Sequence, residues 1–147
     1  MTARPVQLAQ EIVDLLTSAP EGTFPESVAF ERTWISRIPL EEIAPGASIV
    51  SVSCGTVGRE WLSRDEATET YQASILLRRR IDPANEVAGC DDSAGLLESL
   101  YGYLHSNPTP SFGSPESIEV DPLASPDELD QNGLYMAWIG ATYQGTA

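Results

Sequence analysis

The most regular pattern in the chain is the alternation of apolar and polar residues over 69–82, ETYQASILLRRRID. One set of alternate positions is apolar and comprises Tyr71, Ala73, Ile75, Leu77 and Ile81. The other set is mostly polar and comprises Thr70, Gln72, Ser74, Arg78 and Arg80, with Leu76 as the exception. Successive side chains of a β-strand point to opposite faces, so this period predicts a strand with one face on a core.

Four further segments have the composition of strands, namely residues 28–35, 48–54, 117–122 and 134–145. The last, LYMAWIGATYQG, is apolar at both sets of alternate positions. That composition predicts a central strand, or a strand with one face against a partner. Residues 55–67 are rich in glycine and charge, and are predicted to form a long exposed loop or the tip of a long hairpin.

Two longer segments repeat apolar residues at the 3.6-residue spacing of a helix. The first covers residues 6–18 and is predicted to end before Pro20. The second has its apolar stripe over residues 96–104 and is predicted to begin at a cap formed by Asp91 or Asp92. Gly95 and Gly102 weaken this helix, and we interpret them as positions where another element packs closely.

A short third helix is predicted from its start and stop residues. Ser125 is expected to cap it, Pro126 to take its first position, and Glu128 to complete a capping box. Asn132-Gly133 is expected to end it.

The order of these elements is helix, three strands, helix, strand, short helix, strand. It predicts an α+β fold in two layers, with a mostly antiparallel four- to five-stranded sheet and two main helices packed on one face. A chain of 147 residues with no linker or repeat is expected to form one domain, residues 1–147.

The chain has 22 Asp and Glu residues against 8 arginines and no lysine, which gives a formal net charge of -14. Proteins that bind DNA gain affinity by replacing counterions with Lys and Arg. Anionic membrane surfaces likewise attract basic segments. We therefore expect neither nucleic-acid binding nor membrane binding.

Residues that could carry catalysis or bind metal are scarce. The sequence contains no nucleophile elbow, phosphate-binding loop, zinc-protease or EF-hand motif. Cys54 and Cys90 are interpreted as small, partly buried thiols, with a disulfide between them left open. His105 is the sole histidine, which argues against a zinc site. We predict no catalytic, cofactor or metal site, and rank an enzyme as the third hypothesis.

The functional hypothesis starts from the three arginines that end strand 69–82. Arg78 and Arg80 are predicted to project from the face away from the core, and Arg79 to lie on the core side with its guanidinium reaching water. On that outer face the arginines form either a solvated strand end that prevents edge pairing, or one half of a contact with carboxylates of another copy.

Residues 55–67 are the second candidate interface. Trp61 stands among charged residues, as interface anchors do, although packing against its own domain is the alternative. The candidate interface residues are Arg78, Arg79, Arg80, Arg59, Trp61, Leu62 and Arg64.

Six segments carry a resemblance to a known family. They are LAQEIVDLL, FERTWISRIPLEEI, YQASILLRRRID, LLESLYGYL, SIEVDPLASPDELDQNG and LYMAWIGATY. Their order along nearly the whole chain resembles that of small phage neck and tail-completion proteins, particularly the tail terminators of long-tailed phages and prophages. The shared motifs are structural and include no catalytic signature.

The resemblance implies a virion protein, assembled in the host cytoplasm, that forms a homohexameric ring at the head-proximal end of a tail. Such a ring ends tail-tube polymerisation and joins the tail to the neck, without a cofactor or enzyme activity. Its partners would be its own copies, the tail-tube protein and neck or connector proteins. DNA would pass through the lumen without specific binding, and an acidic lumen suits that passage because it repels the duplex.

Two alternatives stay open. A related fold occurs in neck adaptors, or head-closure proteins, and in tail-tube proteins, so the resemblance also allows those positions. The residues themselves allow a monomeric or dimeric accessory module that binds proteins through a DNA-like acidic surface.

Overall fold

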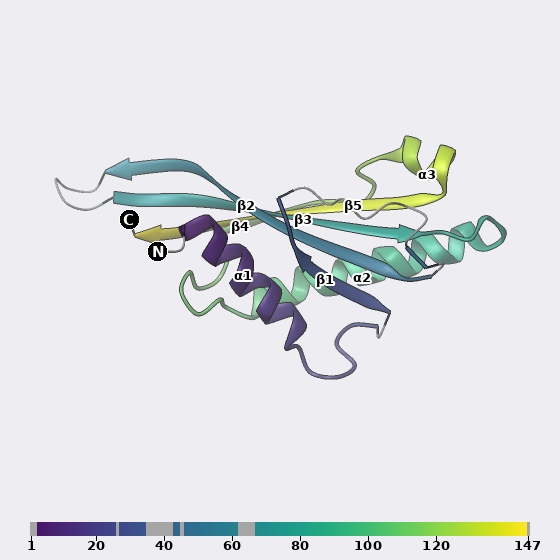
Figure 1. The fold of residues 1–147 in the computed structure, drawn as a ribbon, viewed down its shortest axis with the longest axis horizontal. Helices are drawn as coiled ribbons and strands as arrows, with labels where there is room; N and C mark the ends of the chain where they lie inside the picture. Colours follow the sequence, from purple (N-terminus) through teal and green to yellow (C-terminus); the bar gives the residue numbers. More distant parts are fainter. Residues whose placement is uncertain (1–2, 26, 35–42, 45, 62–66, 147) are drawn as a thin grey trace.

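The computed structural model describes residues 3–25, 27–34, 43–44, 46–61 and 67–146, with the side chains of 56–57, 59–61, 67 and 146 outside the description. These residues form one five-stranded sheet, three α-helices and a short 3-10 helix (Figure 1). In chain order the elements are α1 (Arg4–Thr17), β1 (Val28–Arg32), β2 (Ser48–Trp61), β3 (Ala67–Arg80), η2 (Pro83–Asn85), α2 (Glu86–Ser106), β4 (Ser117–Asp121), α3 (Pro126–Asn132) and β5 (Leu134–Thr146).

The sheet has the strand order β1-β2-β3-β5-β4. Three of its four strand pairs are antiparallel, and β1 runs parallel to β2. The predicted α+β class and the mostly antiparallel sheet are therefore confirmed. β1 and β2 depart from the antiparallel pattern, and no hairpin can join them, because a parallel pair needs a longer crossover connection. β5 lies between β3 and β4, as its apolar composition predicts.

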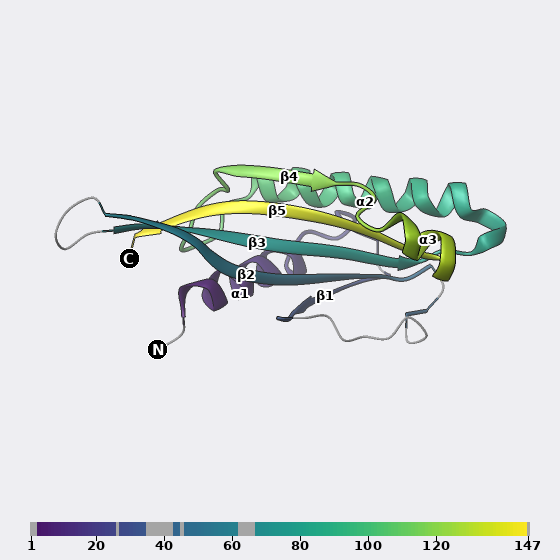
Figure 2. The ribbon, with the colours of Figure 1, turned by 90° about the horizontal axis from the view of Figure 1, so that it is seen from above.

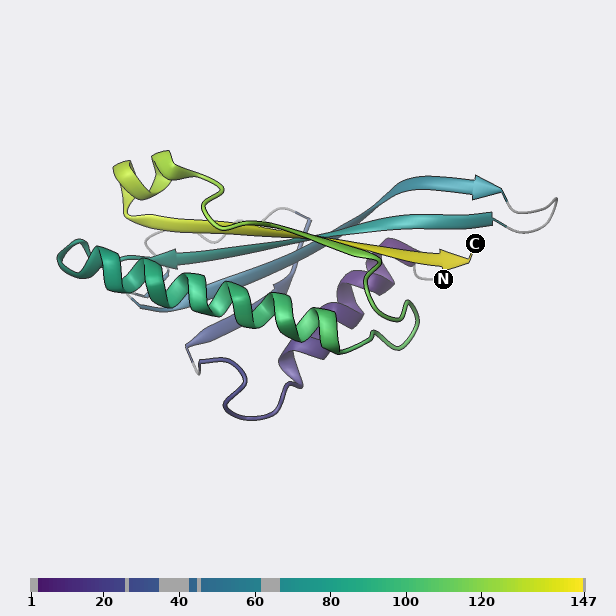
Figure 3. The same ribbon diagram turned by 180° about the vertical axis from the view of Figure 1, so that it is seen from behind.

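The two main helices lie on one face of the sheet, which confirms the predicted two layers (Figures 2 and 3). We call this the packed face, and the face turned away from α1 and α2 the open face. The helices and the packed face enclose one apolar core, whose fully buried residues include Leu8, Ile12, Leu100, Leu104, Tyr71, Ile75, Leu77, Ile139 and Tyr143. Among the described helices, only α3 lies on the other side of the sheet, near the start of β5 (Figure 1).

Residues 55–61 and 67 belong to the strands of a long hairpin, which is the second of the two predicted alternatives. β2 continues to Trp61, and β3 begins at Ala67, which pairs with it. The register shifts between Thr56 and Gly58, which marks a β-bulge in this part of β2. The part of this hairpin that extends beyond α1 is called the arm (Figure 1). In the arm, β5 pairs with the edge of β3 that faces away from β2.

The predicted start of the second helix is wrong. α2 begins at Glu86, so Asp91 and Asp92 lie inside the helix and cap nothing. The chain turns earlier, where the carboxylate of Asp82 accepts a hydrogen bond from the backbone N–H of Ala84 at 3.0 Å. That bond caps η2, which leads directly into α2. A turn capped by Asp82 was not visible in the apolar periodicity, because the first turns of α2 are largely exposed.

The limits of α3 are confirmed, whereas its capping box is not formed. The helix runs from Pro126 to Asn132 and is followed by Gly133, whose φ of 64° is the left-handed conformation that favours glycine. The Ser125 side chain makes no capping hydrogen bond. Glu128 instead accepts a hydrogen bond at 2.9 Å from the side-chain amide of Asn132, one turn later in the helix.

The interpretation of Gly95 and Gly102 as sites of close packing is also wrong. A Cβ atom added to either residue would meet nothing within 4 Å. The close approach in α2 occurs instead at Gly89, where an added Cβ would lie 3.2 Å from the Ile81 side chain.

Candidate functional site

Arg78 lies on the open face, as the alternation predicts, but it is buried rather than projecting into solvent. Its side chain is 8% exposed. It stands on β3 between Ile49 of β2 and Met136 of β5, its register partners on the two sides. The solvated strand end that we considered for this arginine is therefore wrong, and Arg78 is part of the floor of the open face.

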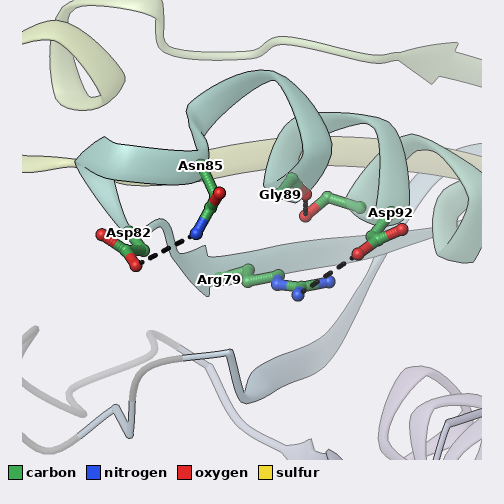
Figure 4. A network of polar contacts seen from close by, with 6 residues as sticks. Arg79, Asp82, Asn85, Gly89 and Asp92 are labelled. Atoms are coloured by element: carbon green, nitrogen blue, oxygen red, sulfur yellow. Dashed lines mark hydrogen bonds and ion pairs between the residues drawn. The ribbon is translucent and has the colours of Figure 1, made fainter.

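Arg79 lies on the packed face and binds a residue of its own chain. Its guanidinium forms an ion pair of 3.8 Å with Asp92 of α2 (Figure 4). The Arg79 side chain is mostly buried, whereas Asp92 is exposed. The arginine thus ties the end of β3 to the second turn of α2, close to the turn in which the Asn85 side-chain amide donates a hydrogen bond of 3.5 Å to the Asp82 carboxylate (Figure 4).

Arg80 lies apart from the other two arginines, in a hollow of about 370 Å³ at the start of α2. The hollow is bordered by Glu86 of α2 and by Asp130 and Asn132 of α3. The three consecutive arginines therefore occupy three separate surroundings rather than one basic patch. Whether any of them meets another copy stays a prediction.

Two of the second group of predicted interface residues, Arg59 and Trp61, lie toward the end of β2 in the arm. Arg59 and Trp61 belong to β2, where they pair with Glu69 and Ala67 through their backbones. Their side chains are outside the described part of the molecule, as are Leu62 and Arg64 altogether. The interface role of these four residues stays a prediction.

The open face holds a groove that the arginine pattern did not indicate. We call it the open-face groove; its volume is about 370 Å³ and its lining is mostly apolar. It is lined by Thr33, Trp34, Ser51, Ser53, Ser74, Leu76, Arg78, Met136 and Trp138. Its floor crosses β2, β3 and β5, and one rim is formed by the residues that follow β1.

Trp138 lies flat on the sheet within this groove because its neighbour along the strand face is glycine. A Cβ atom added to Gly140 would lie 2.3 Å from Cη2 of Trp138 and 3.1 Å from the side-chain amide nitrogen of Gln72. The approach to Trp138 is too short for real atoms and the approach to Gln72 is tight, so the indole occupies the space that a side chain would fill. Gly140, which has no side chain, thereby leaves room for the Trp138 indole.

Trp34 is the functional candidate that the sequence reasoning missed. It was assigned to a strand over residues 28–35, whereas β1 ends at Arg32. Trp34 therefore stands beyond the strand, 68% exposed, on the rim of the open-face groove. The sequence did contain one signal for this surface. Both faces of β5 are apolar, which allowed for a partner on the face that carries Trp138.

Two strand edges are open in the described residues, on opposite sides of the arm. β1 pairs with β2 only as far as Val52, whose carbonyl also accepts a hydrogen bond of 2.9 Å from Thr33. From residue 53 to the end of β2, the outer edge has no strand partner within the described ranges. On the other side, β4 pairs with β5 only up to Thr142, which leaves residues 143–146 without an outer partner among the described strands.

Among the titratable side chains near the core, Cys54 and Tyr143 are buried, Cys90 is partly exposed and His105 is exposed. Cys54 and Cys90 are both free thiols. Burial raises the pKa of the Cys54 thiol to about 12, which keeps it protonated at neutral pH. Burial also raises the pKa of Tyr143, with a smaller contribution from Cys54. His105 lies in the last turn of α2, exposed and stacked on Tyr101 at 6.2 Å between ring centroids.

Comparison of the sequence with protein-family models and with curated proteins gives no match. In the described residues, no cluster of three or more His, Cys, Asp or Glu side chains is arranged to hold a metal ion. None of the described helices has both the length and the apolar character to cross a membrane.

Proposed function

We propose that the protein is a non-enzymatic structural subunit that assembles head to tail into a ring at the head-proximal end of a phage tail. The observation that carries the proposal is the pair of open strand edges on opposite sides of the arm. The position in a tail, the hexameric stoichiometry and the virion location follow from the resemblance of the sequence to tail terminators.

An open strand edge presents unpaired backbone N–H and C=O groups that can accept another strand. When an edge pairs with the same edge of a second copy, the assembly stops at a dimer. When the β2 edge of one copy pairs with the β5 edge of the next, each copy keeps one edge available. Such heterologous contacts close into a ring when the rotation between copies divides a full turn, and otherwise form a filament.

The charge of the chain supports a role around DNA. With a formal net charge of -14, a ring of identical copies would carry a dense negative charge. Duplex DNA would be repelled by such a ring and would pass through it without binding. The ring would end polymerisation of the tail tube on one side and bind neck proteins on the other. A head-closure or tail-tube subunit would use the same ring, at another position in the particle.

A second candidate function is an accessory module that binds another protein through its acidic surface. The charge favours it too, because exposed carboxylates occur on α2, β4 and α3. This module would act as a monomer or a dimer and would not need either open edge. Tight binding to a nucleic-acid enzyme, without association with particles, would favour this function.

The first test blocks one open edge without altering the core. Because the Val52 carbonyl points to the outer edge of β2, the backbone groups of Cys54 and Thr56 point there as well. Proline at position 56 removes an N–H group from that edge. We expect the wild-type protein to form rings by sedimentation velocity and electron microscopy, and Thr56→Pro to be monomeric with an unchanged circular dichroism spectrum. A wild-type protein that stays monomeric at every concentration contradicts self-assembly.

The second test addresses the particle itself. Mass spectrometry of purified tails or virions from the source of this sequence should detect the protein in a fixed ratio to the tail-tube protein. Its absence from intact particles contradicts the tail assignment, even if the purified chain forms rings.

A further inference from the structure

A single row of side chains crosses the floor of the open-face groove from one edge of the sheet to the other. The register of the strands places Glu31, Ser51, Leu76, Trp138 and Asp121 next to one another, one residue from each strand. Residues that are paired across strands point to the same face of the sheet. The row therefore ends in a carboxylate on each side of its apolar pair, Leu76 and Trp138.

The next row toward the arm is built of small residues and lets the Trp138 indole lie against the sheet. Ser53, Ser74 and Gly140 are paired across β2, β3 and β5, and Glu119 of β4 pairs with Gly140. The indole covers the open side of Gly140, so it lies beside Glu119 as well as beside the carboxylate that ends its own row. One face of the ring is thus turned to the sheet and the other away from it, between two exposed carboxylates.

The charge that the groove presents to solvent is negative. Glu119 and Asp121 are both exposed, and the Asp121 carboxylate is held in place by a backbone N–H at 3.2 Å. Glu31 is half-buried and accepts a hydrogen bond of 2.5 Å from the Ser51 hydroxyl. Arg78 is the one cation among the described lining residues, and it is only 8% exposed. An occupant therefore meets two accessible carboxylates and little accessible positive charge.

An aromatic face flanked by carboxylates recognises cations, because the ring attracts positive charge and the carboxylates pair with it. We propose that the open-face groove binds a segment of a different protein that carries an arginine beside apolar side chains. The guanidinium stacks on the Trp138 indole and pairs with Asp121 or Glu119. The apolar side chains contact Leu76 on the floor and Trp34 on the rim. Arginine suits this site better than lysine, since its planar group both stacks and forms two parallel hydrogen bonds.

The composition of the chain argues against two other occupants. A second copy brings 22 Asp and Glu residues against 8 arginines and no lysine, so an acidic site repels it. DNA is repelled for the same reason. A basic segment of another protein is the occupant with complementary charge. This inference does not rest on the ring, because the groove lies on the open face and not on the two open strand edges.

A pair of peptides tests whether the groove recognises positive charge. The probe is acetyl-Leu-Ser-Arg-Ser-Leu-amide, whose arginine and leucines share one side when the peptide is extended. Its control has citrulline in place of arginine, which keeps the shape and removes the charge. Affinity is measured by isothermal titration calorimetry, and the site is located by the NMR signals of the three tryptophan indole N–H groups. We expect the arginine peptide to bind about three- to tenfold more tightly, with shifts at Trp34 and Trp138.

Four variants separate the parts of the site. Asp121→Asn keeps a hydrogen-bond acceptor and removes the charge, whereas Trp138→Leu keeps an apolar side chain and removes the aromatic face. Both should bring the affinities of the two peptides close together. Trp34→Leu should weaken both peptides equally, because this rim residue contacts only the apolar side chains. Glu98→Gln, which removes an exposed carboxylate of α2 on the packed side of the sheet, should leave both affinities unchanged.

The inference is overturned by equal affinities of the two peptides for the wild-type protein, or by the absence of indole shifts at millimolar peptide. A preference for arginine that survives in both Asp121→Asn and Trp138→Leu overturns it as well. Shifts of the Trp34 and Trp138 signals on concentrating the protein without peptide also overturn it, because they show a second copy in the groove. The oligomeric state is measured separately. A groove that binds the arginine peptide in a protein that never forms rings upholds this inference and contradicts only the proposed assembly.

Discussion

The two faces of the sheet are built from the same strands and differ in what covers them. On the packed face, residues such as Ile75, Leu77 and Ile139 are completely buried under α1 and α2. On the open face, their neighbours Leu76, Met136 and Trp138 are only half-buried and line a groove. The chain thus covers one apolar surface of the sheet with its own helices. The other surface has the composition of one that meets a partner.

The largest difference is expected between two adjacent residues on β3. Leu77→Ala removes a fully buried side chain from the packed face and should cost about 2–5 kcal/mol of the free energy of unfolding. Leu76→Ala, on the open face, should cost about 1 kcal/mol or less, because this leucine is only partly buried. Urea unfolding of the two variants at a concentration where the protein is monomeric measures both. Equal losses would show that the open face is a second core.

A smaller effect is expected at Gly140, where the Trp138 side chain approaches the backbone of the open face most closely. Gly140→Ala places a methyl group where Trp138 lies, and the displaced indole should cost about 1–3 kcal/mol. Gly102→Ala is the matched control, since its added methyl group meets nothing and should stabilise α2 by about 0.5–1 kcal/mol. Urea unfolding and tryptophan fluorescence measure the two effects. An unchanged stability in Gly140→Ala would mean that the Trp138 indole does not occupy the space next to Gly140.

The burial of the packed face should also appear as a dependence of stability on pH. The pKa of Cys54 is about 12 in the folded protein, against its ordinary value of 9.0. The unfolded chain therefore loses this proton first, and stability falls as the pH rises above 9. The loss is expected to approach about 1 kcal/mol between pH 9 and 10. Cys54→Ala should remove this part of the slope, whereas Cys90→Ala should leave most of it. Unfolding midpoints that do not change over this range would contradict the buried thiol.

The smallest effect is expected at the ion pair between Arg79 and Asp92. Exposed ion pairs contribute at most about 1 kcal/mol, and the Asp92 carboxylate is exposed. Asp92→Asn should therefore lower stability only slightly, and high salt should reduce the difference further. Asp91→Asn, which removes an exposed carboxylate from the neighbouring position of α2, serves as the control. A loss of several kcal/mol in Asp92→Asn would give this pair a larger role than its geometry indicates.

The fold could be predicted in detail wherever side chains alternate between water and core. The 69–82 pattern places Tyr71, Ile75 and Leu77 on the packed face, and all three are buried there. The bounds of β5 and α3 agree with the pattern to within a residue or two. The start of α2 could not be found in this way, because it depends on a local hydrogen bond from Asp82 and not on periodicity.

The candidate site was predicted less well, because residues that are adjacent in a strand need not lie in the same surroundings. The alternation placed Arg78 and Arg80 together on the outer face and Arg79 on the core side, yet the sheet, α2 and α3 divide all three among separate places. Trp34 shows the opposite limitation. Nothing local marks it as exposed, and only the pairing of β1 with β2 shows that the strand ends before it.

The most direct test of the account is an electron-microscopy reconstruction of the assembled protein. The account predicts a closed ring in which the β1–β2 side of each copy faces the β5–β4 side of the next. A particle built on two-fold contacts between like edges would contradict it.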